Sequence, residues 1–201
     1  NRTAGERIGK GEKSSDVLAS TESVIEGVPT TKSVMQLAER TGIEALRRTT
    51  REEPDYDVLM QYRLDLMAEH GLTMSVIQDV IGTLEPLPGA KAFLDALRER
   101  TQVVILSDTF EQFAEPLMRQ LGFPTLFCNQ LEIDQAGRIV NYHMRMQNQK
   151  KHSVAALKSL NFHVLAAGDA YNDTAMLGEA HAGFFFRPPD HLPKEFPEFP
   201  V

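Results

Sequence analysis

Hydrophobic positions divide the chain into three parts with different patterns. Residues 1–33 are mostly polar and contain only short apolar pairs, such as Val17 with Leu18. Such a segment buries too little surface to offset the entropy lost on ordering, so we expect it to be poorly ordered. Apolar residues in 34–85 recur at helical spacing and predict a compact helical cap. In 86–201, short apolar runs alternate with amphipathic segments, which predicts a parallel sheet covered by helices.

The predicted fold class is α/β: a Rossmann-like parallel sheet core with helices on both faces, a small helical cap insertion and a β-hairpin. Prolines and a glycine at 85–89 mark the return from the cap to the core. Asp108 or Thr109 is expected to cap the helix that follows, and the proline-rich tail from Pro188 is expected to be irregular. The expected core elements are helices at 90–97, 110–121, 153–160 and 174–180, strands at 102–106, 126–128, 162–167 and 183–186, and a hairpin at 131–142.

Composition limits the classes of function. The chain has 201 residues, 42% of them hydrophobic, and a formal net charge of -7. An acidic chain without a basic stripe is a poor partner for nucleic acid. No apolar run is long enough to cross a bilayer, so we expect no membrane partner. The single cysteine, Cys128, excludes an internal disulfide and favours a reducing compartment, so we predict a cytoplasmic location.

Polar side chains follow two of the apolar strands. Ser107 comes directly after the run at 103–106, and Asp169 comes directly after the run at 164–168. Parallel strands bring such residues to the carboxyl end of the sheet, where open α/β sheets bind their ligands. Lys150 lies between the two strands in the sequence. A hydroxyl, a lysine and a pair of carboxylates suit a phosphate group with a divalent cation.

The order of these motifs resembles the haloacid dehalogenase-like phosphatases. Their signature is an apolar strand ending in Ser or Thr, then a lysine, then an apolar strand ending in one acid that a second acid follows. The Gly-Asp-x-x-Asn-Asp form at 168–173 and Leu-Pro-Gly at 87–89 are similar to the phosphoserine phosphatase branch. Residues 34–200 share the resemblance. Three longer runs look like the bifunctional phosphoserine phosphatase/homoserine phosphotransferase subgroup: 54–60, 105–110 and 116–125.

The resemblance implies that the matching residues carry phosphoryl chemistry. Ser107 and the backbone N–H of Asp108 would donate to phosphate oxygens, and Lys150 would oppose the negative charge of the phosphoryl group. Asp169 would be the direct ligand of Mg²⁺, the implied cofactor. Asp173 would act outside the metal's own ligands, by orienting a metal-bound water or Lys150.

The resemblance also implies how the substrate is recognised. In this family the helical cap selects the substrate, here a small phosphorylated amino acid. Arg63 lies in a predicted cap helix where relatives bind the substrate carboxylate, although a solvated helix residue explains it equally well. Asn172 would hydrogen-bond the phosphate or a carboxylate, and Asp108 replaces a glycine found in many phosphoserine phosphatases. A homodimer is a further suggestion of the resemblance.

One family motif is not found in the sequence. In the bifunctional subgroup it reads Asp-Leu-Glu-Gly-Val and begins with the nucleophilic aspartate. An ungapped count back from the cap places Val24 at the nucleophile's position and Glu26 at that of the general acid/base. Asp16 is the other acid considered, but the residues before it are too polar for a central strand. We therefore interpret residues 1–33 as a replacement of the motif-bearing strand and expect the sheet to lack its central strand.

The predicted function is Mg²⁺-dependent hydrolysis of O-phospho-L-serine, with phosphoryl transfer to homoserine as an additional activity. In intact relatives the reaction passes through an aspartyl-phosphate. The first alternative is an impaired fragment or pseudoenzyme that binds phosphoserine without turnover, since the nucleophile is missing. The second is a receiver-like or nucleotide-binding domain, and the lack of a Gly-rich phosphate loop argues against nucleotide binding.

Overall fold

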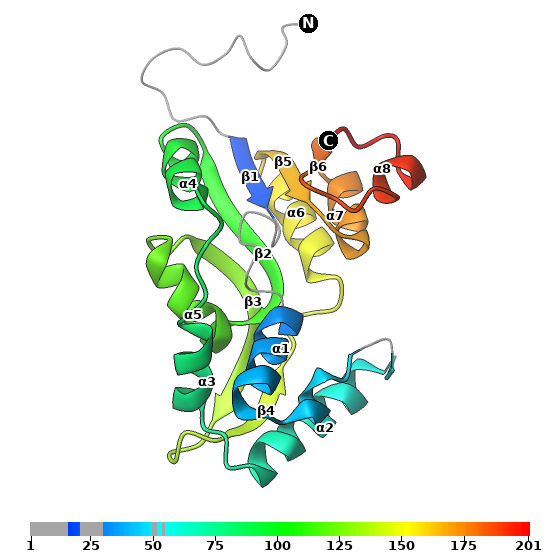
Figure 1. The fold of residues 1–201 in the computed structure, drawn as a ribbon. Helices are drawn as coiled ribbons and strands as arrows, with labels where there is room; N and C mark the ends of the chain where they lie inside the picture. Colours follow the sequence, from blue (N-terminus) through cyan, green and yellow to red (C-terminus); the bar gives the residue numbers. More distant parts are fainter. Residues whose placement is uncertain (1–15, 21–29, 50–51, 54) are drawn as a thin grey trace, which may run out of the picture.

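A computed structural model describes residues 16–20, 30–49, 52–53 and 55–201. These residues form a six-stranded sheet with the strand order β4-β3-β2-β1-β5-β6 (Figure 1). The pairing is parallel throughout except between β3 and β4, which form the predicted hairpin. The strands are β1 (Asp16–Ser20), β2 (Gln102–Phe110), β3 (Thr125–Ile133), β4 (Ile139–His143), β5 (His163–Gly168) and β6 (Ala182–Phe185).

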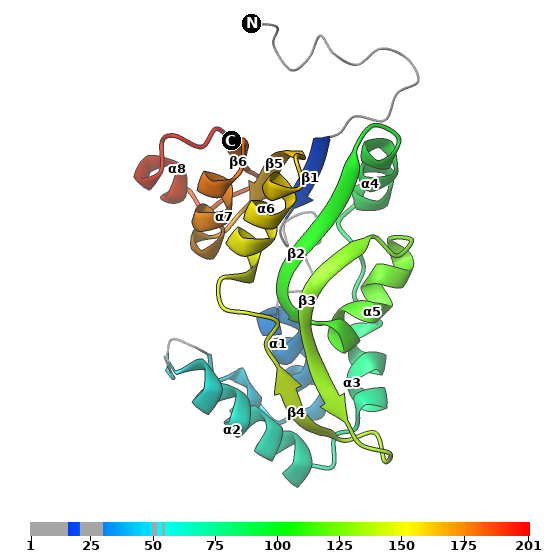
Figure 2. The same cartoon turned by 180° about the vertical axis from the view of Figure 1, so that it is seen from behind.

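Helices cover both faces of the sheet, as predicted (Figures 1 and 2). Side chains of β2 alternate between the two faces because successive residues of a strand point in opposite directions. Val103 and Ile105 pack with α4 (Ala90–Arg98) and α5 (Glu111–Gln120). Val104 and Leu106 pack in a second cluster with residues of α6 (Gln149–Ser159), β5 and α7 (Thr174–Glu179). Two hydrophobic layers therefore fix β2, whose end carries the candidate site.

The cap has its own hydrophobic core. It contains α1 (Thr30–Thr41), the 3-10 helix η3 (Glu44–Arg47), α2 (Tyr56–Glu69) and α3 (Met74–Ile81). Their buried residues cluster with Phe110 and Phe113 of the core and with Leu131 and Ile139 of the hairpin. The hairpin is therefore part of the cap's core, although the sequence places it far from the cap helices (Figure 2).

Local hydrogen bonds explain where two of these elements begin and turn. The side chain of Asp55 accepts the backbone N–H groups of Asp57 and Val58 and so caps α2 at its first turn. In the hairpin, the carboxylate of Asp134 accepts the backbone N–H groups of Arg138 and Ala136 and forms an ion pair with the Arg138 side chain. These contacts hold the pKa of the Asp134 carboxyl below its usual range.

The central strand is present, contrary to the expectation that it would be missing. In β1, Val17 lies opposite Gln102 of β2 and opposite Val164 of β5, so the strand joins the two halves of the sheet. The polar residues on either side of β1 make the strand difficult to recognise from the sequence. It forms because the edges of β2 and β5 both need a hydrogen-bonding partner at this position. Helix α1 also begins at Thr30, inside the segment that we expected to be poorly ordered.

Two further local predictions are wrong. Neither Asp108 nor Thr109 caps α5, because β2 continues to Phe110, and Phe110 occupies the capping position. The tail after Pro188 is not entirely irregular, since it contains the short helix α8 (Leu192–Glu195). Over the described ranges, no helix is both long enough and apolar enough to span a membrane.

Candidate functional site

The candidate site lies at the carboxyl ends of β2 and β5, with β1 between them (Figure 1). Ser107 and Asp108 lie in the last part of β2, and Asp169 directly follows β5. The start of α6 brings Lys150 to the same end of the sheet. Residues from three separate parts of the sequence therefore share one pocket, lined among others by Asp108, Lys150 and Asn172.

Lys150 is the centre of this cluster. Its ammonium Nζ lies 3.0 Å from Oδ1 of Asp173 and 3.0 Å from Oδ2 of Asp108, and its side chain is only 7% exposed. The neighbouring Lys151 is exposed to solvent. Because a buried ammonium needs compensating anions, the two carboxylates account for the position of Lys150. The geometry thus separates Lys150 from Lys151, which the sequence alone does not.

Asp173 holds both the lysine and the turn after β5. Its side chain is 1% exposed, and its Oδ2 accepts the backbone N–H groups of Asp169 and Ala170, each at 3.1 Å. A Cβ atom on Gly168 would lie 2.6 Å from the Cβ of Asp173, so this close approach requires glycine. Asp173 lies in the 3-10 helix η4 (Tyr171–Asp173) and contacts the ammonium of Lys150, while its predicted role in orienting Lys150 stays a prediction.

Asp108 gathers three donors on its carboxylate. Besides Lys150, Oδ2 accepts the side-chain amide of Asn172 at 3.1 Å, and Oδ1 accepts the amide of Gln149 at 3.2 Å. The same Gln149 amide donates to the carbonyl of Ser107 at 2.6 Å. Gln149 is a buried member of the cluster that the sequence does not single out, because its only signal is its place next to Lys150.

Ser107 is buried at the end of β2. Its hydroxyl oxygen accepts the backbone N–H of Thr109 at 3.2 Å. This contact uses an oxygen lone pair and is therefore compatible with the hydroxyl donating its own proton to a ligand. Ser107, Lys150 and the turn after β5 are thus brought together at one end of the sheet, as the motif order predicts.

The described residues contain no group of three or more His, Cys, Asp and Glu side chains that could together hold a metal ion. Both oxygens of Asp173 are already engaged, one by Lys150 and the other by two backbone N–H groups. Asp169 is half-buried and is the carboxylate at the end of β5 that fits a metal ligand. The Mg²⁺ site with Asp169 therefore stays a prediction.

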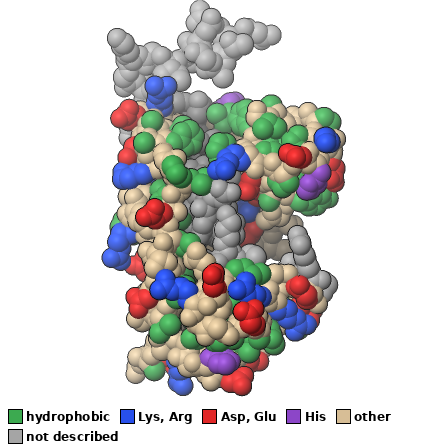
Figure 3. Space-filling model, viewed as in Figure 1, with side chains coloured by type: hydrophobic (Ala, Val, Ile, Leu, Met, Phe, Trp, Pro, Cys, Tyr) green, Lys and Arg blue, Asp and Glu red, His purple; other side chains and the backbone are tan. Residues whose placement is uncertain are grey.

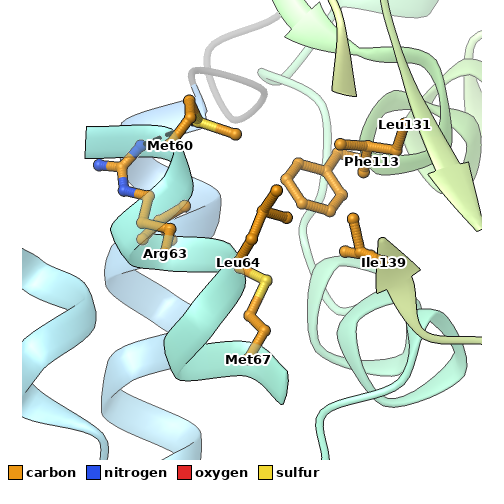
Figure 4. Close-up of a pocket in the computed structure, with 8 residues that line it drawn as sticks. Met60, Arg63, Leu64, Met67, Phe113, Leu131 and Ile139 are labelled. Carbon is orange, nitrogen blue, oxygen red and sulfur yellow. Dashed lines mark hydrogen bonds between the residues drawn. The ribbon is translucent and has the colours of Figure 1, made fainter. Parts of the chain in front are cut away.

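Arg63 lines a different pocket, between the cap helices α1 and α2, helix α5 and the hairpin (Figure 4). Its side chain is buried, and its guanidinium extends toward Met60 and donates to the carbonyl of Arg48 at 3.0 Å. Burial lowers the pKa of Arg63, and no partner is found for its Nε in the described part of the chain. This pocket shares no lining residue with the pocket around Lys150. The alternative of a solvated helix residue is therefore wrong, while the predicted contact with substrate stays a prediction.

The structure describes one of the two acids that the sequence offers for the missing motif. Glu26 lies outside the described residues, as does Val24. Asp16 lies at the amino end of β1, opposite His163, whereas Ser20 at the carboxyl end lies opposite Ala167. At a rise of about 3.3 Å per residue, Asp16 is about 13 Å from that carboxyl end. Asp16 therefore does not occupy the position of a nucleophile beside Lys150.

Comparisons with known proteins agree with the motif order. Residues 7–181 match the family model of the haloacid dehalogenase-like hydrolases. The chain is 58% identical over 177 residues to phosphoserine phosphatase ThrH of Pseudomonas aeruginosa. This alignment covers 88% of the present chain and 86% of the Pseudomonas aeruginosa protein. The chain is also 57% identical over 177 residues to a phosphoserine phosphatase of Pseudomonas syringae pv. tomato. That alignment covers 88% of the present chain and 75% of the Pseudomonas syringae protein.

The fold is similar to solved structures at much lower sequence identity. A phosphoserine phosphatase in its apo form superposes with a TM-score of 0.70 at 17% identity, over 92% of this chain and 91% of that chain. A phospho-aspartyl intermediate analogue of phosphoserine phosphatase gives a TM-score of 0.68 at 15% identity, over 92% of this chain and 91% of that chain. With the matched family model, the predicted resemblance is confirmed: this chain belongs to the haloacid dehalogenase-like hydrolases.

Proposed function

We propose that this protein hydrolyses O-phospho-L-serine to L-serine and phosphate. The observation that carries the proposal is the convergence of Ser107, Lys150 and the turn around Asp169 and Asp173 at one end of the sheet. This convergence occurs in a chain that is 58% identical to a phosphoserine phosphatase. Phosphoryl transfer depends mainly on positioning and charge neutralisation, and these side chains supply both.

The roles of the residues follow from their contacts. Lys150 would bring its ammonium to the phosphoryl oxygens, and Asp173 would keep that ammonium in place through the 3.0 Å ion pair. The hydroxyl of Ser107 and the backbone N–H of Asp108 would donate to other phosphoryl oxygens. Asn172, whose amide lies at the same carboxylate as Lys150, would add another donor.

A divalent cation, Mg²⁺, belongs to the proposal. Mg²⁺ is commonly held by one or two carboxylates together with waters, and Asp169 fits the place of one such carboxylate. When bound, the cation would neutralise part of the phosphoryl charge. Asp173 would not be a direct ligand of the cation, because one of its oxygens accepts the Lys150 ammonium and the other accepts two backbone N–H groups.

The cap would recognise the amino-acid part of the substrate. Arg63 carries a buried guanidinium, and a guanidinium can bind a carboxylate through two parallel hydrogen bonds. If the cap excludes water, an alcohol such as homoserine can accept the phosphoryl group in place of water. We therefore include phosphoryl transfer to homoserine in the proposal. Two other expectations, a homodimer and a cytoplasmic location, also stay proposals.

A second candidate is a protein that binds phosphoserine without turning it over. The observation in its favour is that the described residues of β1 include one carboxylate residue, Asp16, and it lies at the end of the strand away from the site. Without a positioned carboxylate, the family's covalent intermediate cannot form. Glu26 keeps its predicted place as general acid/base, which is not a nucleophile's role.

The decisive experiment measures phosphate release from O-phospho-L-serine by the purified chain with and without MgCl₂, in parallel with phosphoserine binding by calorimetry. The proposal expects release that Lys150→Met abolishes. The control variant Lys91→Met, at an exposed lysine of α4 outside this pocket, is expected to retain release. Binding without release would favour the second candidate. Absence of both would contradict the proposal, and Glu26→Gln tests the acid/base role if release occurs.

A further inference from the structure

Two carboxylates contact the ammonium of Lys150 at the same distance but in different surroundings. Oδ1 of Asp173 and Oδ2 of Asp108 each lie 3.0 Å from Nζ. The side chain of Asp173 is 1% exposed, whereas that of Asp108 is 45% exposed. One carboxylate is thus enclosed by protein and the other borders solvent in the pocket that also contains Asn172.

The contacts of Asp173 make it a fixed partner of Lys150. Its second oxygen accepts the backbone N–H groups of Asp169 and Ala170, and its Cβ packs against Gly168. If this carboxylate moved, the buried ammonium and two backbone N–H groups would lose their acceptor, which is strongly unfavourable. Any ligand that approaches Lys150 must therefore leave Asp173 in place.

The contacts of Asp108 are easier to exchange. The amide of Gln149 lies 2.6 Å from the carbonyl of Ser107 and 3.2 Å from Asp108, so its shorter bond is to the backbone. The remaining donors, Lys150 and Asn172, meet on Oδ2 alone. Since the carboxylate borders solvent, water can replace these contacts when the side chain rotates away.

Lys150 and Asn172 are also the donors that the proposed function assigns to the phosphoryl group, and the present inference rests on that assignment. A carboxylate oxygen between an ammonium and an amide occupies the place that an oxygen of a phosphate would take. From this geometry we propose that Asp108 is a displaceable internal anion that competes with phosphate for Lys150 and Asn172. Asp108 thereby sets the affinity of the site for phosphorylated ligands and favours release of the product phosphate.

The inference predicts that neutralising Asp108 tightens phosphate binding. The probe is inorganic phosphate, titrated by calorimetry into the full chain in metal-free buffer. Asp108→Asn keeps the shape of the side chain and removes its charge, so we expect its Kd for phosphate to fall about tenfold. Asp108→Ala removes both oxygens and is expected to bind at least as tightly as Asp108→Asn. The matched control, Asp79→Asn in the exposed part of α3, makes the same change in net charge and should leave the Kd unchanged.

Equal or weaker phosphate binding by both Asp108 variants would overturn the inference and would mean that Asp108 holds its donors in a binding arrangement. A second measurement uses the unaltered chain, so that it does not depend on how the variants fold. In crystals grown with saturating phosphate, we expect the anion on Lys150 and Asn172 and the carboxylate of Asp108 turned toward solvent. A phosphate elsewhere, with Asp108 still on both donors, would contradict the inference.

The two proposals fail in different ways. If the chain turns over phosphoserine but the Asp108 variants bind phosphate with unchanged affinity, the inference about Asp108 is wrong and the proposed function stands. Tighter phosphate binding by those variants without any turnover would support the internal anion and favour the binding-only candidate. The change in phosphate affinity does not depend on the identity of the nucleophile, so it tests the internal anion separately from turnover.

Discussion

The ion pair between Lys150 and Asp173 allows a quantitative test of how the site is held together. Lys150→Met keeps most of the apolar length of the side chain and removes the ammonium. Asp173, at 1% exposure, then remains as a buried carboxylate without its cation. Breaking a buried pair in this way typically costs about 3–5 kcal/mol. Because two backbone N–H groups still support the other oxygen of Asp173, we expect a loss near the lower value, about 3 kcal/mol.

The contact between Lys150 and the second carboxylate, that of Asp108, adds little to the expected loss of stability. Asp108 is 45% exposed, and solvent-exposed ion pairs contribute about 0–1 kcal/mol. In the double variant Lys150→Met with Asp173→Asn, both charges are gone and the amide can still accept the backbone N–H groups. A double-mutant cycle between the two positions should therefore give a coupling free energy of about 2 kcal/mol.

The assay is urea denaturation followed by far-UV circular dichroism, with free energies of unfolding obtained by linear extrapolation. Lys151→Met is the control, because this exposed neighbour lies in the same turn of α6 and should change stability by no more than about 0.5 kcal/mol. The reasoning is refuted if Lys150→Met costs no more than the control. A coupling free energy near zero would refute it as well.

Three further predictions follow from other contacts. Gly168→Ala forces a Cβ into Asp173 and should lower stability by about 1–3 kcal/mol in thermal unfolding, whereas Gly178→Ala, whose Cβ meets its nearest atom at 3.8 Å, should cost much less. Burial raises the pKa of Cys128 to about 11. Since the thiolate reacts, labelling by a disulfide reagent should be slow at pH 8 and rise with pH toward 11; fast labelling at pH 8 would contradict this. Arg63→Met should maintain or raise the melting temperature, because a buried guanidinium is costly, while phosphoserine binding weakens; a large loss of stability would argue against a substrate role.

The sequence by itself determined the parts of the fold that depend on local pattern. Continuous apolar runs at 103–106 and 164–168 identify buried parallel strands, and both form as predicted. Ser107, Lys150 and Asp169 occur in the order of the family's motifs, and this order led to the resemblance that the family model confirms. The cap helices and the hairpin follow from helical periodicity and from the turn residues around Asp134.

The tertiary structure alone decided what depends on distant neighbours. Strand β1 (Asp16–Ser20) is too short and too polar at its flanks to be recognised locally, and it forms because β2 and β5 each offer it a hydrogen-bonding edge. Asp108 looks like a helix cap in the sequence, but it contacts Lys150 because α6 begins beside the end of β2. Gln149 also has no signal in the sequence, because its contacts with Ser107 and Asp108 depend on the same packing of α6 beside β2. Hydrogen-bond partners at a sheet edge come from segments far apart in the chain, and a local pattern carries no information about which segments meet.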